Sequence, residues 1–140
     1  MLLIARLALA EGAIAEGIAP GGVARGYGIS VRTNHATVEQ ARRDALDGCR
    51  KGPEQTVSGT PTDGGQAQAR RRCKVVTTFR DKCAAVAVDP KDGTPGAGWG
   101  IGDTQLQASE EAVSRCRRVA GEDRLAFCRI TTRMCDGTAK

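Results

Sequence analysis

The stretch Thr37-Val-Glu-Gln-Ala-Arg-Arg-Asp-Ala-Leu-Asp-Gly-Cys49 returns 67 positions later as Thr104-Gln-Leu-Gln-Ala-Ser-Glu-Glu-Ala-Val-Ser-Arg-Cys116. Each copy begins with a capping box, in which a Thr hydroxyl and a Gln amide satisfy the first free backbone N–H groups of a helix. Each then places apolar residues three and four apart, so that they share one helix face. The expected faces are Val38, Ala41, Ala45, Leu46 and Cys49, and Ala108, Ala112, Val113, Cys116 and Val119.

Shorter phrases around these helices also recur, in the same order. Ala13-Ile-Ala15 returns as Ala85-Val-Ala87, and Gly26-Tyr-Gly-Ile29 returns as Gly98-Trp-Gly-Ile101, both 72 positions later. Cys73-Lys-Val-Val-Thr-Thr78 returns as Cys128-Arg-Ile-Thr-Thr132 after 55 positions. An ordered set of repeated phrases predicts one folding unit that is duplicated within the chain.

Each repeat is expected to contain two strands, a helix and a third strand. Short Ala, Val and Ile runs at 12–16 and 83–88 are typical of buried strands, and the stretches 26–31 and 98–102 alternate residue by residue. The third strands are expected at 73–80 and 128–135, each with its first cysteine on the face that the helix covers. The predicted fold is α+β: a duplicated β-β-α-β unit that forms a mainly antiparallel sheet, with two helices on one face.

The supply of large apolar residues is small for this length. Leu, Ile, Val and Phe account for 25 of the 140 residues, and the formal net charge is +5. A chain of this size forms one domain, here expected at 12–136 with repeats at 12–80 and 83–135. With so thin a core, covalent cross-links are expected to contribute to stability, and the six cysteines can supply them.

The cysteine spacing favours disulfides over a metal site. Zinc sites usually contain Cys-x2-Cys pairs and histidines, whereas the nearest cysteines here are Cys128 and Cys135, and His35 is the only histidine. Six cysteines allow fifteen pairings, and the internal repeat narrows them: Cys49 with Cys73 and Cys116 with Cys128, which leaves Cys83 with Cys135. Disulfides indicate an oxidising compartment, so a periplasmic or secreted protein is expected.

Two segments are expected to lie outside the packed repeats. Residues 1–11 are expected to be the remnant of a truncated signal peptide, because the stretch 1–10 is largely apolar and ends in Ala8-Leu-Ala10, a pattern suited to signal peptidase. The alternative is an amphipathic helix of the folded domain. No segment reaches the ~20 apolar residues that a membrane span requires. Residues 51–72 are rich in Gly, Pro, Ser, Thr and Gln and are expected to form a flexible loop that proteases cut first.

No residue pattern predicts catalysis, a cofactor or a metal. His35 has no second histidine as a partner, oxidised cysteines are not nucleophiles, and the glycine-rich strands do not match a phosphate-binding or dinucleotide motif. The glycines around Trp99 are expected to permit close approach of backbone. The alternative is an aromatic binding platform that includes Tyr27 and Trp99, because Trp is frequent at binding hot spots.

Basic residues recur on the third strands of both repeats. Lys74, Arg80, Arg129 and Arg133 are expected on the sheet face opposite the helices, where they would attract an acidic protein or an anionic envelope polymer. The alternative is ordinary solubilising charge. Nucleic acid is disfavoured by the expected compartment and by the scarcity of aromatic residues for base stacking.

The ordered motifs resemble a bacterial secreted family, the domain of unknown function numbered forty-one eighty-nine. The resemblance runs from Gly12 to Cys135 and includes both Gly-aromatic-Gly strands and both Ala-x3-Ala-x3-Cys helices. It implies export and the duplicated fold, and it implies no catalytic residues. The chain differs in having fewer aromatic residues near the Gly-x-Gly strands and a longer segment before Cys73.

The expected function is that of a non-enzymatic extracytoplasmic binding module. The most concrete hypothesis is an inhibitor or immunity-type protein that binds a protein partner such as an envelope enzyme or a toxin. The alternative is a protein that binds an envelope polymer or a glycan. An enzyme is the third hypothesis, and it would require Asp and Glu residues that the fold brings together.

Overall fold

The computed structural model describes residues 10–52, 55–57 and 64–140. The first repeat contains strands β1 (Glu11–Ile18), β2 (Tyr27–His35), β3 (Gln55–Val57) and β4 (Lys74–Arg80), with helices α1 (Val38–Lys51) and α2 (Gly65–Arg71). The second contains strands β5 (Cys83–Val88), β6 (Ala97–Gly102) and β7 (Arg129–Cys135), with helix α3 (Gln105–Ala120) and the 3-10 helix η1 (Glu122–Phe127). The element order therefore follows the predicted β-β-α-β duplication, with β3 and α2 added to the first copy.

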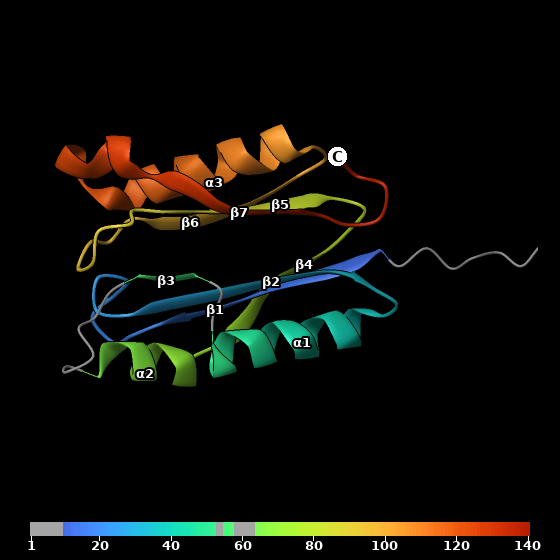
Figure 1. Ribbon diagram of the computed structural model, residues 1–140, viewed down its shortest axis with the longest axis horizontal. Helices are drawn as coiled ribbons and strands as arrows, with labels where there is room; N and C mark the ends of the chain where they lie inside the picture. Colours follow the sequence, from blue (N-terminus) through green and yellow to red (C-terminus); the bar gives the residue numbers. More distant parts are fainter. Residues whose placement is uncertain (1–9, 53–54, 58–63) are drawn as a thin grey trace, which may run out of the picture.

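The strands form two antiparallel sheets that lie face to face. One has the order β3-β2-β1-β4 and the other has the order β6-β5-β7. Figure 1 shows the resulting layers: α1 and α2 cover the outer face of the first sheet, and α3 covers the outer face of the second. The predicted α+β class is confirmed. The structure differs from the single sheet that the sequence suggested, because each repeat builds its own sheet and the two helical layers lie on opposite sides of the molecule.

The two sheets pack together because both sides of their first two strands are apolar. The faces that point away from the helices meet in a central core that contains Ile14, Tyr27, Ile29, Val31, Phe79, Ala84, Val86 and Val88. The opposite faces pack against the helices through small side chains: Ala13 and Ala15 contact Ala41 and Ala45 in one half. Strands β1 and β5 are therefore covered on one face by a helix and on the other face by the opposite sheet. A single sheet would have left one of these faces exposed.

Alanine and cysteine fill the helix–sheet cores, as the sequence predicted. Ala41, Ala45 and Cys49 are buried on α1, and Ala108, Ala112, Cys116 and Ala120 are buried on α3. Val119 was expected on the buried face of α3, but 51% of it is exposed, and Ala120 takes the buried position instead. Both threonines cap their helices as predicted: the Thr37 and Thr104 hydroxyls accept the N–H groups of Gln40 and Gln107. The Gln107 side chain accepts the N–H of Asp103, one residue before the expected position.

The three disulfides have the predicted partners. Cys49–Cys73 joins α1 to the start of β4, and Cys116–Cys128 joins α3 to the residue before β7; the Cα atoms are 6.0 Å apart in both. Cys83–Cys135 links the directly paired ends of β5 and β7, with Cα atoms 4.0 Å apart. Each long helix is therefore bonded covalently to the third strand of its own repeat.

The aromatic phrases of the two repeats do not occupy equivalent positions. Ile14 pairs with Val31 across β1 and β2, whereas Val86, its repeat counterpart, pairs with Trp99 across β5 and β6. The structural counterpart of Trp99 is therefore Val31 and not Tyr27. The similar phrases are therefore offset by four residues of register between the two hairpins. Strand β2 has nine residues and β6 has six.

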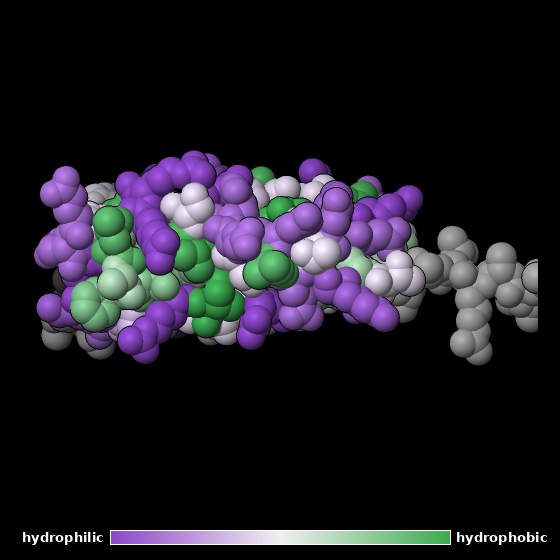
Figure 2. Space-filling model, turned by 90° about the horizontal axis from the view of Figure 1, so that it is seen from above, coloured by the Kyte–Doolittle hydropathy of each residue, from purple (hydrophilic) through white to green (hydrophobic). Residues whose placement is uncertain are grey.

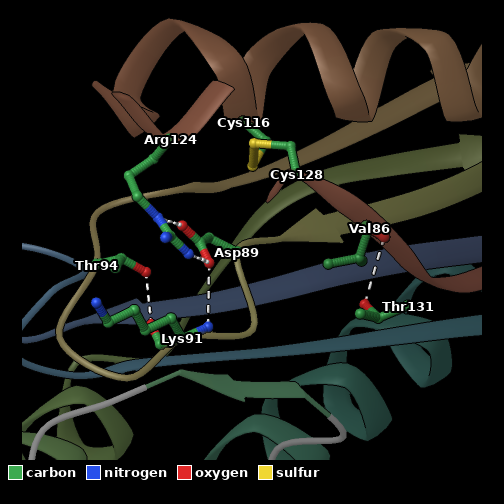
Figure 3. Close-up of a disulfide and its surroundings, with 8 residues drawn as sticks. All are labelled: Val86, Asp89, Lys91, Thr94, Cys116, Arg124, Cys128 and Thr131. Atoms are coloured by element: carbon green, nitrogen blue, oxygen red, sulfur yellow. Dashed lines mark hydrogen bonds and ion pairs between the residues drawn. A yellow bond between two sulfur atoms is a disulfide. The ribbon is translucent and has the colours of Figure 1, made fainter. Parts of the chain in front are cut away.

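The third strands do not alternate regularly, because each contains a bulge. The β1–β4 register shifts between Ile14 and Ala15, and the β5–β7 register shifts between Val86 and Ala87. Thr131, the extra residue in β7, donates its hydroxyl to the Val86 carbonyl at 3.4 Å (Figure 3). A bulge reverses the face of the residues beyond it. Alternate residues of 73–80 and of 128–135 therefore do not all lie on one face of the strand.

The segment 51–72, expected to be a flexible loop, contains β3 and α2. Strand β3 pairs antiparallel with the start of β2. The α2 residues Gly65 and Ala69 are buried, and the Gln66 side chain accepts the backbone N–H of Tyr27 at 2.7 Å. Sequence composition missed this helix because its contacts with the sheet are made by glycine, alanine and one amide.

A buried carboxylate joins the two repeats. Asp136 accepts the N–H groups of Asn34 at 2.6 Å and of Asp81 at 3.2 Å. Both donors lie in the left-handed region, at φ 61° and 50°, which costs energy for residues other than glycine. Gly137 in turn donates its N–H to the Asn34 side chain at 2.9 Å. The end of the second repeat thus completes the end of β2 in the first.

Within the described ranges, no helix is long and apolar enough to cross a bilayer. The expected signal-peptide remnant falls almost wholly on residues 1–9, which lie outside the described residues.

The Cys116–Cys128 disulfide is expected to stabilise the second repeat mainly by restricting the unfolded chain. Replacing both cysteines by serine should lower the free energy of unfolding by about 3 kcal/mol, the value typical of a loop of this length. Urea denaturation followed by circular dichroism measures the change. A loss below about 1 kcal/mol would show that the helix–sheet packing holds this repeat without the bond.

Candidate functional site

The four predicted basic residues lie on edge strands and do not form one face. Lys74 and Arg80 are exposed on β4, and Arg129 and Arg133 are exposed on β7. Arg80 forms an ion pair with Glu11 of the neighbouring strand. The bulge places Arg133 opposite Ala85, whose side chain faces α3. The expected basic sheet face opposite the helices is therefore absent, since that face is the central core and the arginines follow the sheet margins.

Tyr27 and Trp99, in contrast, line one groove. It has a volume of about 500 Å³ and lies between the β1–β2 turn of the first sheet and the β6–α3 side of the second. This groove, called the Trp99 groove below, is lined by Glu16, Ile18, Gly22, Val23, Tyr27, Pro95, Ala97, Gly98, Trp99, Arg115, Arg118 and Val119. Its lining is mostly apolar, with a few polar groups, which is the composition of typical binding sites.

A carboxylate and a phenol lie at the base of the Trp99 groove. The Tyr27 hydroxyl donates to Glu16 Oε2 at 2.7 Å, and Tyr27 is wholly buried. Burial raises the pKa of Glu16 above its usual range, against the opposing effect of the Tyr27 hydrogen bond and of the Lys74 and Arg115 charges. Burial and the nearby Glu16 carboxylate raise the pKa of Tyr27 well above its usual range. Perturbed groups in a groove are typical of functional sites.

The ring of Trp99 already has a cationic partner. The Arg115 guanidinium lies 4.2 Å from the ring centroid, and its Nε donates to Glu111 Oε1 at 2.7 Å. These contacts are made around the margin of β6, because Gly98 and Gly100 allow α3 to lie directly on that strand. A Cβ atom at either glycine would overlap the α3 backbone near Cys116 or Ala108. The glycines therefore permit close approach of backbone, as expected, and the ring face is covered.

A second groove of about 440 Å³ adjoins the first, because both are lined by Glu16 and Ile18. Arg72 and Lys74 border it. The margins of the two grooves thus present four basic side chains around one carboxylate of raised pKa. Lys74 is the only member of the predicted basic set that borders them.

Exposed apolar side chains continue from the Trp99 groove across the helical layer. Val119 is 51% exposed, and Leu125 and Phe127 of η1 are 41% and 38% exposed. Figure 2, which views the molecule from the α3 side, shows apolar residues gathered at the end where η1 lies in Figure 1. Apolar patches of this kind, surrounded by polar residues, mark interaction sites.

An ion pair fixes η1 beside the groove. Arg124 of η1 binds the buried Asp89 through two hydrogen bonds, of 2.7 and 2.8 Å, and Asp89 also accepts the Lys91 N–H (Figure 3). The Arg124 hydrogen bond holds the pKa of Asp89 below its usual range. Arg124 also stacks 3.9 Å from the Phe127 ring. The pair therefore holds η1 against the end of β5.

Sequence reasoning missed Glu16 and the structural roles of Asp89 and Asp136. One signal was available: Glu16 is the only charged residue within the apolar run that follows Gly12, and a charge inside a buried strand has a reason to be there. His35 Nε2 lies 3.2 Å from Asp44 Oδ2. In the described part of the chain, no three His, Cys, Asp or Glu residues are grouped so that they could hold a metal.

Comparison with known families identifies the family of this chain. The model of a domain of unknown function, DUF4189, matches residues 12–135, which include both repeats and all six cysteines. The chain belongs to this family. No curated protein and no solved structure matches the chain. The family description names no activity, so the site has to be interpreted from its geometry.

Replacing Glu16 by glutamine should remove a pH dependence of stability and keep the Tyr27 hydrogen bond. A raised pKa in the folded state means that the wild-type protein loses stability as the pH rises from the ordinary glutamate pKa through the folded value. The stability of the wild-type protein, relative to Glu16→Gln, should therefore be greater near pH 4 than at pH 7. Denaturant unfolding at a series of pH values measures this; parallel curves would contradict it.

Replacing Asp89 by asparagine should have the opposite pH signature. Because the folded pKa is lowered, the wild-type protein holds this stability above the ordinary aspartate pKa and loses it as the pH falls through the folded value. Asp89→Asn should lower the melting temperature by several degrees at pH 7 and by less near pH 3. An equal loss at both pH values would show that packing, and not the charge, determines the effect.

Proposed function

We propose that the protein is an extracytoplasmic binding module, periplasmic or secreted, that binds a protein partner at the Trp99 groove. The observation that carries the proposal is the groove itself, where apolar side chains from two sheets and α3 surround the half-buried Glu16 carboxylate. Three disulfides support an oxidising compartment. A cross-linked scaffold also reduces the ordering cost of binding, because the site is already formed.

The lining suits a protein partner better than a glycan. Sugars usually stack on an open aromatic face, but the Trp99 ring has Arg115 on one side and packs against the central core. Ile18, Val119 and the η1 residues instead offer dispersed apolar contacts, with arginines at the margin. That arrangement matches an apolar side chain flanked by carboxylates. An inhibitor or immunity-type role, toward an envelope enzyme or a toxin, would use such a surface.

A photo-cross-linking amino acid at position 119 tests this function in living cells. We expect one discrete protein adduct, because Val119 borders the groove. The same amino acid at position 106 is the matched control, since Leu106 is an exposed apolar residue of the same helix, 68% exposed, that does not border the groove.

Charge reversal at Arg115 and Arg118 should abolish the Val119 adduct, and the purified partner should bind the wild-type chain in a titration. Equal adducts from positions 119 and 106 would refute the groove as the binding site. A heterogeneous adduct that glycan hydrolases remove, with salt-sensitive retention on cell-wall or lipopolysaccharide material, would instead support the envelope-polymer alternative.

A further inference from the structure

The strands at the sheet edges differ in how well they are protected from pairing. Strands β4 and β7 each contain a bulge and two basic side chains, which are features that stop an edge strand from pairing with another chain. Strand β6 is also an edge strand. Its sequence, Ala-Gly-Trp-Gly-Ile-Gly, has no charge and no proline, and its register with β5 is continuous from Ala97 to Gly102.

The backbone of β6 presents hydrogen-bonding groups outward. The Asp89 N–H donates to the Gly96 carbonyl at 2.9 Å, so Asp89 and Gly96 form a hydrogen-bonded pair. Such pairs alternate along an antiparallel ladder, which directs Gly98 and Gly100 toward β5. The N–H and C=O groups of Ala97, Trp99 and Ile101 therefore point away from β5. The Arg115 side chain crosses this margin to reach Trp99, so an added strand has to displace that side chain.

Grooves border this edge at both ends. The Trp99 groove lies beside Pro95 to Trp99. A groove of about 630 Å³ lies beside Ile101 to Asp103 and is lined on the other side by α3. We call the two grooves and the edge between them the β6 trough. A channel between an edge strand and a helix is the setting in which proteins accept an extended peptide as an added strand.

The two ends of the β6 trough differ in charge. Arg115, Arg118 and Glu16 border the end near Ala97. Asp103, Glu110 and Glu111 border the end near Gly102, where Lys82 pairs with Asp103 and Arg115 pairs with Glu111. Arg118 and Glu110 therefore contribute most of the difference in charge between the ends. An antiparallel strand would begin beside Gly102 and end beside Ala97. The favoured segment therefore has a basic residue at its amino end and an acidic residue at its carboxyl end.

The protein already extends its other sheet by strand addition. Strand β3 has three residues, pairs antiparallel with β2, and places Val57 opposite Tyr27. An added strand on β6 would likewise place a residue opposite Trp99. Directly opposed residues share one face of a sheet, so that side chain would lie on the side of the Trp99 groove, where an apolar group fits.

We propose that the β6 trough binds an extended segment of a partner protein as an additional antiparallel strand, with apolar residues alternating between a basic amino end and an acidic carboxyl end. This inference rests on the proposed protein-binding function and specifies its mode. Main-chain hydrogen bonds to Ala97, Trp99 and Ile101 supply affinity, and the side chain opposite Trp99 supplies specificity.

The test uses blocked heptapeptides and the full chain, isotopically labelled for NMR. The probe is acetyl-Lys-Val-Thr-Val-Thr-Val-Glu-amide, and the control has the same composition with the terminal Lys and Glu exchanged. The probe should shift and protect the amide signals of Trp99 and Ile101 at millimolar concentration. Binding of the control should be weaker, since its charges oppose those of the trough in the antiparallel orientation. Equal binding of both peptides, or no protection at these amides, overturns the proposal.

N-methylation of the peptide backbone tests the hydrogen bonds directly. Methylation of the central Val nitrogen removes the N–H that faces Trp99 and should weaken binding about tenfold, as expected for one lost hydrogen bond. Methylation of a neighbouring Thr nitrogen, which faces away, should have little effect. Equal effects at the two sites would show that the peptide does not add as a strand.

A variant of the protein distinguishes strand addition at β6 from the protein-binding function at the Trp99 groove. Ile101→Pro removes an outward N–H and leaves the β5–β6 ladder intact, and Ile101→Val is its control; thermal unfolding verifies that both fold. Ile101→Pro should lose probe binding and the Val119 cross-link. If the partner still cross-links to Ile101→Pro, strand addition is wrong and the binding function stands. If probe binding is lost as expected but no partner cross-links to the wild-type chain, the proposed function fails instead.

Discussion

Most of this structure depends on one constraint: a disulfide joins each long helix to the residue that precedes an edge strand of its sheet, β4 or β7. With so few large apolar residues, α1 and α3 lie on their sheets through alanine and glycine, which bury little area per residue. Contacts of that kind tolerate no displacement, because small side chains cannot adjust to fill a gap. Cys49–Cys73 and Cys116–Cys128 hold the helices in register, and the close packing that results brings α3 over the margin of β6, where Arg115 reaches Trp99.

The sequence predicted α1, α3 and all strands except β3, because the signals for these elements are local. The helix caps at Thr37 and Thr104, the β-β-α-β order and the three cysteine pairs all follow from spacing along the chain. What it did not specify was long-range: whether two repeats form one sheet or two depends on which faces find apolar partners. Ile14 and Val86 would be apolar strand residues in either arrangement, so they do not distinguish one sheet from two. Bulges at Val76 and Thr131 were also hidden, since a single extra residue leaves the composition of a strand unchanged.

The candidate site also combines features that the sequence predicted with features that it did not predict. Tyr27 and Trp99 were singled out as aromatic residues between glycines, and the structure does bring them to one groove. The two residues nevertheless occupy different positions in their repeats, because Trp99 corresponds in strand register to Val31. Glu16 was missed although it is a charge within an apolar strand, because its contacts with Tyr27 and with the groove come from tertiary packing. The basic residues were interpreted as a binding face, but they lie on the edge strands β4 and β7, where charged side chains disfavour pairing with another chain. The proposed recognition strand, β6, is an edge strand without charged residues.

The Asp136 carboxylate has a consequence for the order in which the molecule can assemble. It holds Asn34 and Asp81 in left-handed conformations that they would not keep alone. The end of β2 can therefore reach its native backbone geometry only after the residues that follow β7 have docked against it. The two repeats complete their folding together, and neither finishes before the other.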